Sequence, residues 1–107
     1  MKFYQPILSV VEQAVEHGMQ EAAEHILEES NRRAPKDEGD LVDSSSVSVT
    51  DLQARIHYGS FYAAWQHERL DYAHDDGEAK FLENAAEAET QAALQIMGAR
   101  IRGELGG

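Results

Sequence analysis

Histidine and carboxylate side chains, which bind zinc or transfer protons, gather in one stretch of this chain, from residue 67 to 78. His67 and Glu68 begin that stretch. The helical zinc motif of metalloproteases needs a second histidine four positions after the first, and position 71 is Asp. A looser zinc site can be drawn from His67, His74, Asp75 and Asp76. Acidic residues ahead of a helix commonly serve as caps, so we expect no metal here.

The sequence lacks the residues that other kinds of catalytic site require. The chain has no cysteine, which removes disulfides, thiolate metal sites and cysteine nucleophiles. Ser44, Ser45 and Ser46 have no glycine elbow around them, and no glycine-rich phosphate loop is present. A chain of 107 residues also has few residues with which to enclose a substrate cleft between two carboxylates. We therefore expect no enzyme and no cofactor. A small hydrolase that uses His67, Glu68 and nearby acids is the weakest hypothesis, behind the two binding functions described below.

The charge of the chain excludes two classes of partner. Nine Lys and Arg stand against twenty Asp and Glu, for a net charge of -11, and the negative charge is spread along the sequence. Binding to phosphate backbones depends on clustered cations, so neither sequence-specific nucleic acid nor an anionic membrane is an expected partner. No apolar run is long enough to span a bilayer, and the N-terminus lacks a signal-peptide core. The sequence predicts one soluble cytoplasmic domain covering residues 1-107.

Two helices and a small sheet must position these residues. Apolar residues every three or four positions predict a helix from Pro6 to Arg33, where Pro35 prevents continuation. After a polar turn at 36–40, alternation predicts strands at 41–50 and 52–58, which form a hairpin. A short connecting element and a capping box at Asp75–Glu78 precede a second helix. The predicted fold class is α+β, with both helices packed on one face of a small antiparallel sheet.

Four aromatic residues lie close together around the predicted end of the hairpin: Tyr58, Phe61, Tyr62 and Trp65. Clustered aromatics in a small domain are commonly core residues. Tyrosine and tryptophan also anchor protein interfaces. Both explanations stay open, and they are compatible if Phe61 and Trp65 face differently from Tyr62.

Three segments, taken in order, resemble a known family. Residues 31–41, which close the first helix, resemble an A-P-x-D-x-G-x-L turn. Residues 62–68 resemble a Y-A-x-x-x-H-E segment, and residues 79–85 resemble a K-F-L-x-x-A helix start. These are motifs of the bacteriophage head-tail joining proteins, the neck or tail-completion family also called minor capsid proteins. The resemblance covers most of the chain.

The resemblance implies a structural protein of the virion neck, made in the host cytoplasm, with no catalysis and no cofactor. Copies in that family form a ring, commonly a hexamer, between the DNA-filled head and the tail. The implied partners are the head connector, tail proteins and other copies of the chain. The implied interface residues are Arg32, Pro35, Gly39, Leu41, Tyr62, Trp65, His67, Glu68, Lys80 and Phe81. Because ring contacts are heterologous, we expect the patch at 62–68 to meet a different patch on its neighbour, at 34–43.

The alternative hypothesis is a small acidic protein-binding module, such as an inhibitor that imitates nucleic acid by its charge. Regularly spaced carboxylates that face one way on both helices would favour it. Its binding to a cationic protein would weaken steeply as salt is added.

Overall fold

The computed structural model describes residues 5–34, 39–50, 52–59, 61–66, 69–72 and 80–106, with side chains at all of these except 5–8, 41, 61, 62, 65, 66 and 69–72. The elements in chain order are α1 (Gln5–Arg33), α2 (Gly39–Asp43), β1 (Ser45–Thr50), β2 (Gln53–Tyr58), β3 (Phe61–Gln66), β4 (Arg69–Tyr72) and α3 (Lys80–Glu104). In the order of the chain, one long helix precedes the antiparallel sheet and the other follows it. The α+β fold class is confirmed.

The sheet has four antiparallel strands in the order β1-β2-β3-β4, whereas the sequence predicted two strands and a connecting element. The predicted hairpin is present, with Thr50 opposite Gln53. At the next reversal Tyr58 pairs with Phe61, and Gly59 in the turn has a φ of 58°. Glycine adopts this conformation without steric cost because it has no Cβ. The aromatic segment is therefore the third strand of the sheet.

The alternating pattern of β2 divides its side chains between two faces. Ala54, Ile56 and Tyr58 are buried, while Arg55 is exposed and His57 is half-buried on the opposite face. His57 therefore lies on the same face of the strand as the exposed Arg55. In β1 the residues that face the core are only half-buried, as expected for a strand at the edge of a sheet.

The segment from 39 to 43 is a short helix, α2, and the predicted strand 41–50 begins later, at Ser45. The backbone amide of Ser44 donates to the carbonyl of Asp40 at 3.2 Å, which closes this turn. Aspartate and glycine favour local turns over extended strands, so these residues agree with a single closed turn ahead of the strand. The predicted turn at 36–40 and the capping box at Asp75–Glu78 lie mainly outside the described residues.

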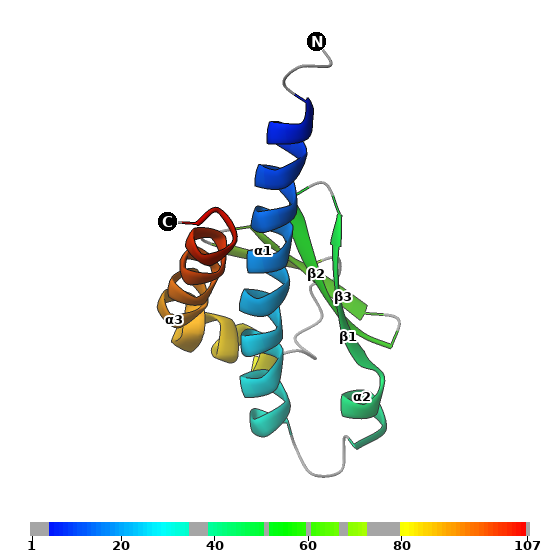
Figure 1. Cartoon of the computed structure of the whole chain (residues 1–107). Helices are drawn as coiled ribbons and strands as arrows, with labels where there is room; N and C mark the ends of the chain where they lie inside the picture. The colour runs from blue at the N-terminus through cyan, green and yellow to red at the C-terminus, as the bar shows by residue number, and fades with distance from the viewer. Residues whose placement is uncertain are drawn as a thin grey trace.

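Helix α1 lies between the sheet and α3 (Figure 1). The two long helices run in opposite directions, and α3 packs chiefly on α1 while touching the sheet at β4. The first helix ends at Arg33, as predicted. The N-terminal turns of α1 project beyond both the sheet and α3, and the molecule is elongated, with extents of 52 × 24 × 22 Å.

One hydrophobic core joins both helices and the sheet. Its larger side chains are Met19 and Ile26 from α1, Ile56 and Tyr58 from β2, and Leu82 from α3. Alanine fills most of the remaining positions: Ala22, Ala23, Ala54, Ala63, Ala86 and Ala93. Small side chains let the two helices approach closely, since the separation of packed helices depends on the residues at the contact.

Candidate interaction surfaces

A buried hydrogen-bond network joins the end of α1 to the sheet. Tyr58 is 1% exposed, and its hydroxyl donates to Asn31 Oδ1 at 2.6 Å. A phenol has one proton, so Tyr58 accepts from the hydroxyl of the fully buried Ser30, at 2.7 Å. Asn31 Nδ2 donates to Ser45 Oγ at 3.3 Å, at the start of β1. The segment that begins at Asn31 is thus anchored to two strands.

The segment at the start of α3 reaches the same tyrosine. The ring of Phe81 stands edge-on to the ring of Tyr58, with centroids 5.5 Å apart and planes at 86°. Tyr58 in turn pairs with Phe61, the first residue of β3. Burial raises the pKa of Tyr58, although its hydrogen bond with Ser30 acts in the opposite direction. The hydroxyl therefore stays protonated and remains a donor at neutral pH.

Three of the predicted interface residues have described positions on the surface. Arg32 is exposed, and its guanidinium bonds Glu29, with Nη2 2.6 Å from Oε1. Gly39 begins α2, with open space around it. Lys80 begins α3 and lies near Glu83, with Nζ and Oε2 3.5 Å apart. These three residues are accessible to a partner.

Phe81 packs against the hydrophobic core and is half-buried. Its contact with Tyr58 supports the fold, and its role at an interface stays a prediction. Leu41 lies in α2, and the register pairs Trp65 with Ala54 and Tyr62 with His57. Positions 65 and 62 are therefore on opposite faces of the sheet, the arrangement under which a core role and an interface role are compatible. Pro35, His67 and Glu68 lie outside the described residues.

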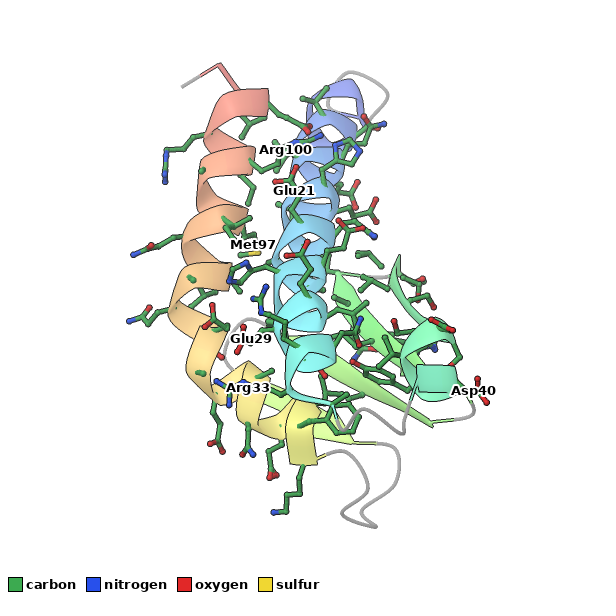
Figure 2. All side chains as sticks on the ribbon, turned by 90° about the horizontal axis from the view of Figure 1, so that it is seen from below. Glu21, Glu29, Arg33, Asp40, Met97 and Arg100 are labelled. Carbon is green, nitrogen blue, oxygen red and sulfur yellow. The ribbon has the colours of Figure 1, made fainter. Side chains whose placement is uncertain are left out.

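The seam between α1 and α3 carries the main ionic contacts. His17 Nδ1 lies 2.7 Å from Glu104 Oε2 across the seam. Arg100 bonds Glu21 across the seam (Figure 2) and Glu104 within its own helix. A second pair, His25 Nε2 and Glu89 Oε1, is 2.6 Å apart and half-buried. His17 and His25 therefore lie at the boundary between the two helices.

Two carboxylates titrate at lower pH because of these partners. Hydrogen bonds from Arg32 and Arg33 lower the pKa of Glu29, and hydrogen bonds from Arg100 and His17 lower the pKa of Glu104. A lowered carboxyl pKa adds stability at pH values above the ordinary 4.5, and this stability is lost as pH falls through the folded-state value.

We expect carboxyl-carbon NMR titrations to give midpoints below 4.5 for Glu29 and Glu104. In Arg100→Gln the midpoint of Glu104 should move upward while that of Glu29 stays in place, because Glu29 is bound by other arginines. A Glu104 midpoint that is unchanged in Arg100→Gln would show that the two residues are not paired in solution.

The projecting end of α1 presents apolar side chains to solvent, which the sequence pattern did not distinguish from core positions. Val10 is 51% exposed and Val11 is 39% exposed, although both continue the apolar stripe of the helix. Ala14, one turn later, is fully buried. A second signal in the sequence marks this end, since residues 3–11 contain no charged side chain in a chain of net charge -11. Apolar surface of this kind is typical of a contact with another protein.

The described residues contain neither a metal-binding cluster nor a membrane-spanning helix. Within the described part of the chain, no three His, Asp or Glu side chains come together as a metal site. The loose zinc site at His67 and His74 falls outside the described residues. Among the described helices, none is long and apolar enough to cross a bilayer.

Comparison with known proteins adds no relative. No family model, curated protein or solved structure matches this chain.

Proposed function

We propose that this protein is a structural component of a bacteriophage neck, which joins the DNA-filled head to the tail as a ring of identical copies. The proposal begins from the three segments that resemble the head-tail joining family. They are far apart in the sequence, at residues 31–41, 62–68 and 79–85.

The observation that carries the proposal is that two of these segments contact the same buried residue, Tyr58. Asn31 Oδ1, from the first segment, accepts a hydrogen bond from the hydroxyl of Tyr58, and Phe81, from the third, packs on its ring. The second segment lies mostly in β3, the strand paired with the strand of Tyr58. Each of the three segments therefore lies next to β2.

The surface of the molecule suits assembly on a preformed partner. A net charge of -11 keeps free copies apart at long range, since like charges repel. The exposed valines at the projecting end of α1 offer an uncharged contact at short range. This combination favours a protein that binds when a partner holds it in place.

The acidic binding module is less well supported by the placement of carboxylates. Nucleic-acid mimicry requires free carboxylates on one continuous face. Instead, Glu21, Glu29 and Glu104 each bind an arginine of the same chain. The negative surface is therefore interrupted at the seam between the helices.

The test is deletion of the gene from an inducible phage that carries it, followed by electron microscopy of the lysate. We expect filled heads and finished tails lying apart, and joined particles once purified protein is added. Normal infectious particles from the deletion phage would remove the neck function and move the acidic binding module to the front.

A second experiment tests the projecting end of α1 in the same complementation. The variant Val10→Asp/Val11→Asp should fold with wild-type helix content but fail to restore joined particles, because it places charge in an apolar contact. The control Ser9→Asp/Gln13→Asp adds the same charge to the same exposed turns and leaves both valines in place. Equal complementation by both variants would exclude the valines from the contact.

A further inference from the structure

The edge of the sheet at β1 lacks the features that usually prevent strands from pairing between molecules. Proteins protect such edges with charged side chains, proline, bulges or a covering element. The six residues of β1 include no charge, proline or glycine. Their pairing with β2 runs without a bulge from Ser45 to Thr50. Among the described strands, β1 has a neighbour on one side only.

Within the described residues, the main helix contact of β1 lies on one face of the strand. Helix α1 packs on β1, and Val47 and Val49 of the strand contact the hydrophobic core between the strand and this helix. This packing covers one face of the strand. The side chains of Ser46, Ser48 and Thr50 are exposed on the other face.

The opposite edge of the sheet, β4, has the strand direction needed to pair with β1. The four strands alternate in direction, so β4 runs antiparallel to β1. If β4 of one copy lay beside β1 of the next, the joined sheet would continue its antiparallel order without a break. Antiparallel addition at an open edge is a common way for proteins to bind an extended segment.

We propose that β1 of each copy pairs with β4 of a neighbouring copy, so that the ring is built as one continuous sheet. This inference names the surfaces through which copies of the proposed ring contact one another. It rests on the proposed function only for the location of that ring in the phage particle.

The register within one copy matches residue types across the proposed junction. Residues that are Cα partners across the four strands form rows, each with one residue from β1, β2, β3 and β4. The rows that matter at the junction are Ser48, Arg55, Ala64 and Asp71, then Val49, Ala54, Trp65 and Leu70, and then Val47, Ile56, Ala63 and Tyr72. Extending each row into the next copy places Leu70 beside Val49 and Tyr72 beside Val47. Asp71 then lies beside Ser48. Apolar positions therefore meet apolar ones.

Charge opposes the direct pairing of two β1 strands. Asp43 precedes β1 and Asp51 follows it in the sequence. An antiparallel pair of β1 strands would bring Asp43 of each copy toward Asp51 of the other, and like charges opposite one another are destabilising. In the head-to-tail junction Arg69, the first residue of β4, falls beside the uncharged Thr50.

The experiment uses the absence of native cysteine to trap the junction. In Ser48→Cys/Asp71→Cys the two thiols are three strand spacings apart within one copy, about 14 Å, which is too far for a disulfide. Oxidation should therefore link different copies only. We expect a ladder of dimers, trimers and higher multimers on a denaturing gel, loss of the monomer band, and reversal by reductant. The ladder should grow as salt rises to about 1 M, where screening weakens the repulsion between copies.

Matched variants identify the contact. Ser48→Cys alone and Ser48→Cys/Gln91→Cys, whose second thiol lies on the exposed surface of α3, should give only weak collisional dimers. A register shifted by two residues would move the ladder to Asp71→Cys combined with Ser46→Cys or Thr50→Cys, and would still support the proposal.

Two results would overturn the proposed junction. One is the absence of multimers above the collisional controls for all three pairs with Asp71→Cys. The other is near-complete dimerisation of Ser48→Cys alone, which would indicate pairing of two β1 strands. Cross-linked multimers together with a fully infectious deletion phage would retain the sheet junction and remove the neck function. Absence of cross-linked multimers, together with separated heads and tails from the deletion phage, would remove the sheet junction and retain the neck function.

Discussion

Replacing Tyr58 with alanine is expected to lower the free energy of unfolding by about 3–5 kcal/mol, the range for truncating a large buried aromatic residue. The side chain is 1% exposed and belongs to the core that joins both helices to the sheet. Its loss would leave a cavity beneath Phe81 and two polar partners without a hydrogen bond. Native stability of a small domain is about 5–15 kcal/mol, so the variant should be close to unfolding at 37 °C.

Tyr58→Phe separates the hydroxyl from the ring and keeps this prediction testable if the alanine variant does not fold. Leaving the buried hydroxyl of Ser30 without its partner should cost about 1–3 kcal/mol in urea unfolding. Adding Ser30→Ala to Tyr58→Phe should cost less than the sum of the two single changes, because the second change removes the unpaired group. A cost for Tyr58→Phe within about 0.5 kcal/mol, as at a surface site, would mean that the network contributes little to the fold.

Replacing Gly18 with valine should lower the free energy of unfolding by about 1–3 kcal/mol, the usual cost of overpacking a core. Gly18 lies on α1 where it meets α3, and a Cβ there would stand 2.9 Å from both Cγ and the carbonyl oxygen of Met97. It would also stand 3.3 Å from Ile101. The Met97 side chain can move, but its carbonyl belongs to the backbone of α3, so the helices must separate.

Gly103→Val is the matched control, because a Cβ at Gly103 meets no atom within 4 Å. Thermal unfolding of this variant should differ little from the wild type, within about 0.5 kcal/mol. The helix separation has a second readout, since Arg100 and Glu21 bridge the same seam (Figure 2). Nuclear Overhauser contacts between the side chains of Arg100 and Glu21 should be lost in Gly18→Val and kept in Gly103→Val. Equal stability of the two variants would contradict the close approach of the helices.

Local patterns in the sequence were sufficient for much of the architecture. The three-to-four-residue spacing of apolar side chains predicted the first helix and its end at Arg33. The alternation from Leu52 to Tyr58 predicted β2 and the face to which each side chain belongs. Gly59 marked the next reversal. Each of these features depends on residues close together in the chain, so each is visible in the sequence.

Other features depended on partners far away in the chain. Residues 61–66 lack alternation, because Ala63 and Ala64 are adjacent and both are buried, so the third strand was not predicted. Val10 and Val11 continue the same apolar stripe as Met19, and only the shorter reach of α3 and the sheet leaves them exposed. A spacing pattern reports which residues share a face, and it carries no information about where the opposing surface ends.

The candidate surfaces divide in the same way. The sequence by itself determined the α+β class and the excess of negative charge, whereas the resemblance of three segments to head-tail joining proteins stays a prediction. The tertiary structure decided that residues of two of these segments contact Tyr58, that β1 is the end strand of the described sheet, and that Glu21, Glu29 and Glu104 are paired with arginines. Composition and periodicity are properties of short stretches of chain, whereas burial, strand order and ion pairing arise when stretches up to 87 residues apart are brought into contact.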